Sequence, residues 1–383
     1  MHDFDEAVDR RQSDSVKWRR YDPDVIPLYA ADMDFASPAP VQRALHERVE
    51  HGFFGYPVES AELRELWAER LQRLYGWQVA PEWLVFTPGV AVGVSMACRT
   101  VAEPGDGVLI PTPIYAFLSV LDFSRFDCVQ VPLNTESNGR YVMNFEALEG
   151  AITDRTRALF LCNPHNPVGR AYRPDELERL ADICLRRRIA ICSDEVFSDL
   201  LFPGSRHTPI ASLAPEIGQQ TFTLMSPGKT FNLAGCRVAV AIIPNPQLRA
   251  RFQAIGGGIV PEVSIFGYVA ALAAYREGQS WLEEVLRYLE GNRDFVAEYV
   301  RSHLPGVRMV LPEATYVAWL DCRQAGIPGN PADFFLRQAR VAVNDGATFG
   351  RGYEQFVRLV FGSPRSLVAE ALDRMAEALR RRP

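Results

Sequence analysis

Short apolar runs alternate with helix-like stretches between residues 83 and 243, and this alternation constrains the fold more than any other feature. Several runs are continuously apolar, which is typical of strands covered on both faces. Between two of them, Leu177, Leu180, Ala181 and Cys184 recur at helical spacing. The pattern predicts an α/β fold with a mainly parallel sheet. The expected strands are 83–87, 108–110, 128–131, 158–162, 189–192, 221–225 and 238–243.

The pattern changes after about residue 276. A long helical stretch at 281–304 leads to expected strands near 316–320 and 356–359, and a final helix carries Val368, Leu372, Met375 and Leu379 on one face. At 383 residues, the chain is long enough for a second core. We therefore predict a large domain of residues 41–275. A smaller α+β domain comprises 276–383 with the N-terminal segment 1–40, although the residues alone leave open which part that segment packs against.

Composition narrows the function classes. The formal net charge of -6 argues against nucleic-acid binding, which needs a basic surface. Seven cysteines include no C-x-x-C pair and no Cys/His cluster, so we expect buried thiols in a reducing compartment and no metal site. The first residues lack an apolar secretory stretch, and no run of about eighteen apolar residues could span a bilayer. We expect a cytoplasmic protein without membrane contact.

Lys229 lies in the small-residue loop Ser226-Pro227-Gly228-Lys229-Thr230, directly after the expected strand 221–225. Open α/β sheets bind ligands at the carboxyl ends of their strands. Small neighbours would let a flat cofactor approach the amine, and Schiff-base chemistry needs such an amine with a lowered pKa. A lone lysine in a loop can equally be an ordinary solvent-exposed side chain.

Two other strands end in polar groups. Asn166 lies between two prolines in Asn163-Pro164-His165-Asn166-Pro167, after strand 158–162. The prolines favour an extended loop that leaves the amide of Asn166 free, although the same residues also make ordinary turns. Asp194 closes strand 189–192, where a carboxylate needs a partner such as the protonated ring nitrogen of a cofactor. A helix cap or a salt bridge is the alternative for Asp194.

An anion site is also possible near residues 87–91. Thr87-Pro88-Gly89 joins a strand to a helical run at 90–101, and a helix N-terminus offers free amides, here those of Val90 and Ala91. Ser226 and Arg237 flank Lys229 and could add a hydroxyl and a guanidinium to the same anion. Arg237 could otherwise be a surface arginine at the start of a strand.

Asn166, Asp194 and Lys229 occur in that order, 28 and 35 residues apart. With this spacing, the chain resembles fold-type I enzymes that use pyridoxal 5′-phosphate (PLP), and within them the aminotransferase class I/II family. Further segments are similar to its cystathionine β-lyase branch, which cleaves C–S bonds in cystathionine and cysteine conjugates. These segments are Phe4-Asp5, Val8-Asp9-Arg10, Lys17-Trp18, Ala31-Asp32-Met33-Asp34-Phe35, Phe54-Gly55-Tyr56, Tyr316-Val317-Ala318-Trp319-Leu320-Asp321, Phe356-Val357-Arg358-Leu359 and Pro364-Arg365-Ser366.

The resemblance implies a PLP-dependent transferase fold and a role for each matching residue. Lys229 would form the Schiff base with PLP and then carry the α-proton. The amino-acid substrate would place its carboxylate on Arg358 and lie along the backbone at Ala31. The expected unit is a homodimer, in which Tyr56 reaches the neighbouring subunit's phosphate. The implied cofactor contacts are Asp194 to the pyridine nitrogen, Asn166 to the ring 3-oxygen, Tyr115 stacked on the ring, and Ser226, Arg237, Val90 and Ala91 at the phosphate.

The chain departs from the branch at three places. Phe197 stands where the lyases usually carry His and aminotransferases Tyr, and a phenyl ring cannot hydrogen-bond the 3-oxygen. Val360 and Phe361 stand where the branch usually has Asn-Ala, so we expect a reshaped substrate pocket. Arg237 is more typical of aminotransferases. Three hypotheses follow: β-elimination from a cysteine S-conjugate; transamination, or a related deamination coupled to decarboxylation; and a regulatory protein that keeps the PLP fold as a sensor.

Overall fold

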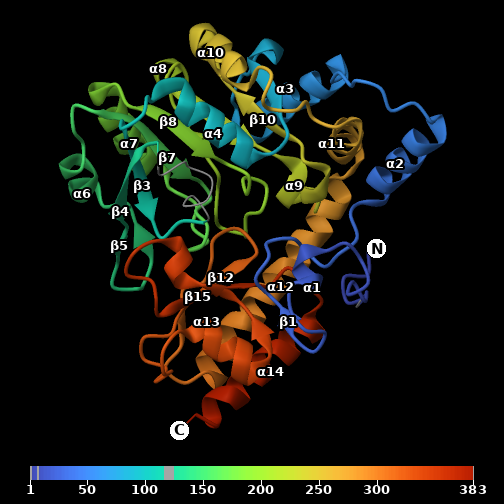
Figure 1. The fold of residues 1–383 in the computed structure, drawn as a ribbon, viewed down its shortest axis with the longest axis vertical. Coiled ribbons are helices and arrows are strands. Elements are labelled where there is room, and N and C mark those ends of the chain that lie inside the picture. The colour runs from blue at the N-terminus through green and yellow to red at the C-terminus, as the bar shows by residue number, and fades with distance from the viewer. Residues whose placement is uncertain (1, 7, 116–124, 383) are drawn as a thin grey trace.

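A seven-stranded sheet with helices on both faces forms the larger part of the molecule (Figure 1). The structure is a computed structural model that describes residues 2–6, 8–115 and 125–382. The strand order is β2-β10-β9-β8-β7-β3-β4. The strands are β2 (Leu84–Thr87), β3 (Gly107–Thr112), β4 (Asp127–Pro132), β7 (Thr156–Cys162), β8 (Ala190–Asp194), β9 (Thr221–Met225) and β10 (Ala239–Ile242).

The strands β9, β8, β7, β3 and β4 pair in parallel, and only β10 runs against its two neighbours in this sheet. The prediction of an α/β fold with a mainly parallel sheet is confirmed. Each strand expected between residues 83 and 243 overlaps an observed one. The reversal at β10 was not predicted. It follows from the short connection to β9, which contains only the turns α9 (Pro227–Thr230) and Ala234–Cys236 and is too short for a crossover to a parallel strand.

Successive residues of the central strand β7 enter different cores. Phe160 packs in the core beneath α4 (Val90–Val101), whereas Leu159 and Leu161 pack in the core beneath α7 (Pro174–Arg187). Both faces of the sheet are therefore covered, which explains why its strands are continuously apolar. The further helices of this part are α2 (Ala39–His51), α3 (Ala61–Tyr75), α6 (Phe145–Gly150), α8 (Pro215–Gly218), α10 (Pro246–Gly256) and α11 (Ile265–Glu277).

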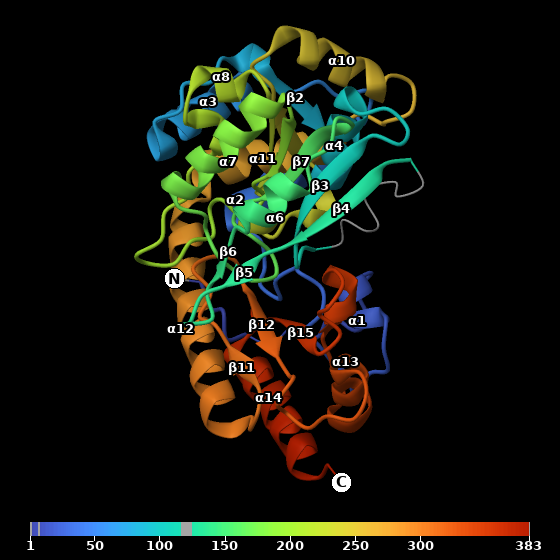
Figure 2. The ribbon, with the colours of Figure 1, turned by 90° about the vertical axis from the view of Figure 1, so that its left-hand side faces the viewer.

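A second, antiparallel sheet of four strands forms with the C-terminal helices the lower part of Figure 1. The long helix α12 (Gln279–His303) extends from the large sheet along this part, as Figure 2 shows, and packs against α14 (Arg365–Arg380). The strand order is β11 (Arg308–Met309), β12 (Val317–Asp321), β15 (Phe356–Val360) and β14 (Asn344–Asp345). Shorter elements are α13 (Pro331–Phe334) and the hairpin strands β5 (Asn134–Thr135) and β6 (Tyr141–Val142).

The N-terminal segment contacts both parts of the molecule. Its strand β1 (Ile26–Pro27) pairs in parallel with β13 (Val341–Ala342), and its short helix α1 (Val16–Arg19) precedes β1. Residues 31–35 then run toward the loop after Lys229. Sequence periodicity could not place this segment, because it has little regular secondary structure. Across the described ranges, no helix is both long and apolar enough to cross a membrane.

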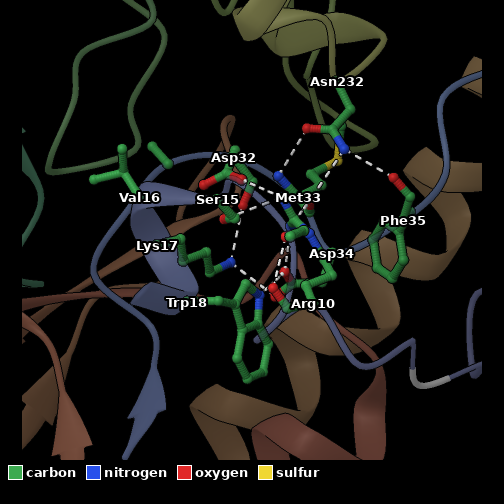
Figure 3. A network of polar contacts seen from close by, with 12 residues as sticks. Arg10, Ser15, Val16, Lys17, Trp18, Asp32, Met33, Asp34, Phe35 and Asn232 are labelled. Atoms are coloured by element: carbon green, nitrogen blue, oxygen red, sulfur yellow. Dashed lines mark hydrogen bonds and ion pairs between the residues drawn. The ribbon is translucent and has the colours of Figure 1, made fainter. Parts of the chain in front are cut away.

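A buried polar network holds the N-terminal segment in place (Figure 3). The carboxylate of Asp34 accepts hydrogen bonds from Lys17 Nζ at 2.8 Å, Trp18 Nε1 at 2.8 Å, Arg10 at 2.6 Å and Ser363 Oγ at 2.7 Å. The side chains of Lys17 and Asp34 are 1% and 4% exposed. Burial alone would raise the pKa of Asp34, but Lys17 and the other donors outweigh it and lower that pKa below its ordinary value.

We predict that Lys17→Met destabilises the protein by about 3 kcal/mol, because it leaves Asp34 buried without its most buried cation. Urea unfolding at neutral pH measures this loss. The folded pKa of Asp34 is lowered, so its contribution is present above the unfolded pKa of about 4 and is lost as the pH falls below it. The deficit of the variant should therefore shrink in acid. Arg19→Met, which removes an exposed pair with Asp14, is the control and should cost little. Equal losses in both variants would contradict the assigned role of Lys17.

Candidate active site

Four polar side chains lie at one edge of the large sheet because four parallel strands end there. Tyr115 follows β3, Asn166 follows β7, Asp194 closes β8, and Lys229 follows β9 in α9. The register aligns these ends: Cys162 of β7 lies opposite Asp194, which in turn lies opposite Leu224 of β9. The structure thus brings together the side chains that the sequence singled out at strand ends.

Lys229 lies in the short turn α9, which Ser226 caps through its hydroxyl and the amide of Gly228 at 2.9 Å. Its Nζ donates to the carbonyl oxygen of Ala31 at 2.6 Å. Burial lowers the pKa of Lys229 to about 8, and the charge of Arg358 acts in the same direction. The lowered pKa increases the neutral fraction of this amine near physiological pH, as a nucleophilic lysine requires.

Asp194 offers an open carboxyl group beside this lysine. One of its oxygens accepts the amide of Val196 at 3.1 Å. Burial raises the pKa of Asp194 to about 6, although the Val196 amide and the charge of Lys229 oppose that rise. The neighbouring Glu195 is directed elsewhere, since it accepts a bond from buried His207 at 2.7 Å. Asp194 is thus the carboxyl group available to a ligand at this edge.

Arg358 enters the site from β15 and is 1% exposed. It donates to the carbonyl of Tyr29 at 2.7 Å and to the side-chain oxygens of Asn344 at 2.6 Å and Asn166 at 3.2 Å. Its Nε has no partner and no carboxylate pairs with it among the residues that the structure describes. Burial lowers the pKa of Arg358 to about 10, against the opposing effects of two tyrosines. A buried cation without a counter-charge is suited to an anionic ligand.

Asn166 and Tyr115 form the wall next to Arg358. The amide of Tyr115 donates to the carbonyl of Asn166 at 3.1 Å, and the guanidinium of Arg358 lies 4.7 Å from the centre of the Tyr115 ring. The ring is 42% exposed, so part of it can receive a further flat group. The side-chain oxygen of Asn166 is used by Arg358, while its amide nitrogen has no bond within the described part of the chain. That nitrogen can donate to a ligand oxygen.

His165 joins the loops that carry Asn166 and Tyr115. It is fully buried, with Nε2 2.7 Å from the carbonyl of Pro113 and Nδ1 2.9 Å from the hydroxyl of Tyr172. Burial lowers the pKa of His165 to about 4, so the ring is neutral at physiological pH. Nε2–H therefore donates to Pro113, and Nδ1 accepts from Tyr172. His165 was not predicted as a site residue, because a histidine inside a proline-rich turn has no periodic signal.

The expected anion-binding groups lie near the start of α4. The helix begins at Val90 after Gly89, whose φ of 123° is strained for any residue with a side chain. Its first intrahelical amide bond is from Gly93 to Gly89, so within the described residues the amides of Val90 and Ala91 have no partner and can receive an anion. Arg237 is exposed near this end of β10. Ser226, however, already donates its hydroxyl to Val238 at 2.7 Å, so contact with an anion requires that proton to turn.

Two of the three departures from the branch pattern, at Phe197 and at Val360-Phe361, are buried, whereas Arg237 is exposed. Phe197 packs edge-on against Tyr316, with ring centres 5.5 Å apart, and offers no polar atom to the site. Val360 and Phe361 lie in the C-terminal core, and their amides donate to the carbonyls of Leu28 at 2.8 Å and Tyr316 at 2.9 Å. Their effect on the substrate pocket stays a prediction.

The comparisons with known proteins agree with this geometry. Residues 23–375 match the model of the family "Aminotransferase class I and II". The chain belongs to this family. It is 35% identical to cystathionine β-lyase PatB of Bacillus subtilis (strain 168), over 98% of this chain and 99% of that protein. Among solved structures, it is similar to OvoB (42% identity, TM-score 0.95, 99% of this chain and 100% of that chain). It is also similar to cystalysin of Treponema denticola, which contains PLP (30% identity, TM-score 0.95, 99% of both chains).

The residues at the sheet edge of this aminotransferase class I and II member fit PLP. A partly neutral lysine suits the aldehyde, a carboxyl group suits the pyridine nitrogen, and the free amide nitrogen of Asn166 suits the ring oxygen. The amides at the start of α4 suit the phosphate. Several residues that contact Arg358, Ala31 or the segment 33–35 were not predicted from the sequence, because such contacts join distant parts of the chain and leave no local pattern. They are Tyr29, Asn344, Tyr316 and Asn232.

We predict that His165→Phe destabilises the protein by about 3 kcal/mol, because it leaves the Pro113 carbonyl and the Tyr172 hydroxyl buried without partners. Thermal unfolding followed by calorimetry measures this, with Tyr172→Phe as a milder comparison. Since the folded pKa of His165 is about 4 and the unfolded one about 6.5, the unfolded chain binds the extra proton between these values. The wild-type protein should therefore lose stability as the pH falls through this range, and His165→Phe should show a smaller slope. An unchanged slope would exclude His165 as the responsible group.

Proposed function

We propose that this protein is a PLP-dependent C–S β-lyase that acts on cystathionine or a related cysteine S-conjugate and releases a thiol, pyruvate and ammonia. The observation that carries the proposal is the presence at one site of Lys229, an amine with a lowered pKa, and Arg358, a buried cation that has no counter-charge among the described residues. Lys229 can supply the amine that the reaction needs, while Arg358 binds the carboxylate of the same amino acid. The similarity to cystathionine β-lyase PatB along nearly the whole chain supports the C–S lyase assignment.

In this proposal, Lys229 holds the cofactor covalently and Arg358 receives the substrate carboxylate through its unpaired Nε edge. PLP, when bound, withdraws electrons from the α-carbon, which allows a thiolate at the β-carbon to leave. Lys229 Nζ, once released, takes the α-proton, because the neutral amine is the basic form. The backbone at Ala31 lines this position, and its carbonyl is 2.6 Å from Nζ.

The remaining site residues hold the cofactor in this proposal. Asp194 stabilises the protonated pyridine nitrogen, and Tyr115 packs on the ring. Asn166 donates its amide to the ring oxygen while its own oxygen stays on Arg358 at 3.2 Å, so one side chain links cofactor and substrate sites. The phosphate lies at the start of α4. The groups assigned to it are the amides of Val90 and Ala91 with Ser226, Arg237 and the partner's Tyr56.

The lyase proposal predicts that purified protein carrying PLP converts cystathionine to pyruvate and a thiol in equal amounts without an added keto acid. Enzymatic pyruvate determination and thiol titration measure the two products. Lys229→Ala should lose the visible cofactor band and lower turnover by about 10⁴-fold or more, since it removes the group that carries the proton. Asp194→Asn should keep the covalent link and still lose turnover.

Product analysis also separates the competing chemistries. An absolute need for a keto-acid acceptor, with no pyruvate from the substrate, would replace the lyase with an aminotransferase. Release of carbon dioxide together with ammonia would favour the decarboxylating deaminase.

We further propose a homodimer in which Tyr56 serves the neighbouring site. Tyr56 is fully exposed, and its apolar neighbours Phe53, Phe54 and Val58 are each more than half exposed, although side chains of this kind are costly to leave in water. A second copy of the chain would cover them. In the same proposal, residues 41–275 form the cofactor-binding domain, and 1–40 with 276–383 form the smaller one. The seven cysteines, all free thiols, suit a cytoplasmic location.

A mixing experiment tests the dimer. If Tyr56 acts across the interface, inactive Tyr56→Ala and Lys229→Ala subunits should regain roughly a quarter of wild-type activity when co-refolded, because half of the random dimers contain one intact site. Mixing Lys229→Ala with Arg358→Met, two residues of the same site, should regain none and serves as the control. No recovery in the first mixture would place Tyr56 in its own subunit's site, and an active Tyr56→Ala protein would place it outside both sites.

A further inference from the structure

We propose that the carbonyl oxygen of Ala31 is the resting acceptor for the amino group of Lys229 when that group is free, and that Asn232 is the positioning residue that holds this carbonyl in place. The inference rests on the proposed function for its meaning in catalysis. Its structural content concerns the protein without cofactor and can be tested separately. Lys229 and Ala31 are 198 residues apart in the chain, so other interactions must align them for their 2.6 Å contact.

Asn232 supplies this alignment. Its side chain is bonded to the backbone of the N-terminal segment at three points: its oxygen accepts the amide of Met33 at 3.0 Å, and its amide donates to the carbonyls of Met33 at 2.9 Å and Phe35 at 2.8 Å. Figure 3 shows the side chain reaching across to both residues. Asn232 lies three residues after Lys229, so one short stretch carries both the lysine and the clamp for its acceptor.

The backbone at Asn232 supports a specific role. Its φ is 56°, in the left-handed region that residues other than glycine adopt less readily. This conformation continues the turn after α9 and directs the side chain toward residues 33–35. On the other side, the network around Asp34 holds the same segment against Lys17 and Ser363. The segment is therefore fixed from both parts of the molecule.

Tyr316 shares the acceptor. Its hydroxyl donates to the Ala31 carbonyl at 2.8 Å, so this oxygen receives two donors. Two hydrogen bonds to one carbonyl oxygen weaken each other, because each donor reduces the electron density that is available to the other. Tyr316 thus limits how strongly Ala31 can stabilise the protonated lysine, which must lose its proton to act as a base.

Other charges around Lys229 set the background for this balance. Arg358 from β15 and Lys17 from α1 disfavour the protonated amine, whereas Asp32 and Asp194 favour it. None of these groups is changed by substituting Asn232 or Tyr316. A shift in lysine titration in those variants therefore reports on the Ala31 carbonyl.

The experiment measures the pH dependence of Lys229 modification by an amine-specific imidoester in cofactor-free protein, with peptide mass spectrometry as the readout. Asn232→Gly keeps the left-handed backbone and removes the clamp. We expect its titration midpoint to fall by about one pH unit, because the ammonium loses a hydrogen-bond acceptor. Tyr316→Phe frees the carbonyl for Lys229, so the midpoint should rise. A general loosening of the site would move the titration midpoint in the same direction in both variants, so opposite shifts point to the Ala31 carbonyl.

Gln220→Ala is the matched control. Gln220 donates its amide to the backbone carbonyls of Cys184 and Ile189 near the opposite end of β8 and β9, so the variant loses comparable bonds far from the lysine. It should lower the melting temperature without moving the midpoint. In loaded enzyme, Asn232→Gly should lower kcat several-fold with little change in KM.

An unchanged midpoint in both site variants, or shifts in the same direction, would overturn the proposal. A lack of lyase activity together with the predicted midpoint shifts would refute only the proposed function.

Discussion

The alignment of parallel strand ends is the constraint on which the site depends. Asp194 lies level with Cys162 on one side and Leu224 on the other, so the loops after β7 and β9 begin at the same height as the carboxylate. Parallel pairing makes this possible because all the carboxyl ends face one edge. A shift in register would separate Asn166, Asp194 and Lys229 even if every strand remained intact. The continuous apolar sequence of these strands therefore serves the site indirectly, by holding their register between two covered faces.

The second sheet and the N-terminal segment contribute the remaining residues of the site at the edge of the large sheet. Arg358 reaches the edge from β15 and is bonded both to Asn166 of the large sheet and to Tyr29 of the N-terminal segment. Asn232 connects the loop after Lys229 to residues 33–35 of that segment. The three parts of the chain thus meet at the ligand position through direct hydrogen bonds. Movement of one part relative to another would change the distance between the lysine and the arginine.

The sequence predicted the parts of the structure that depend on local pattern. The apolar runs predicted the strands, and the helix 90–101 was expected at the bounds that the structure gives for α4. Asn166, Asp194 and Lys229 were identifiable by their order and spacing, which resemble those of fold-type I PLP enzymes, because each of them alone could be an ordinary turn, cap or loop residue. The contacts of Ala31 with Lys229 and Tyr316 were not, since a backbone carbonyl leaves no residue signature. The short pairing of β1 with β13 spans more than 300 residues and has too few residues for a periodic signal.

The site concentrates positive charge that folding alone does not neutralise. The pKa of Lys229 is lowered to about 8 and that of Arg358 to about 10, mainly because both are buried. Burying such groups costs free energy, which the fully paired network around Asp34 and the apolar cores can offset elsewhere. An anionic ligand would relieve this cost at the site itself, because it brings the missing counter-charge to Arg358. The free energy that the folded protein loses by burying these cations is thus regained in part when a carboxylate binds. A carboxylate is the group that every amino-acid substrate carries.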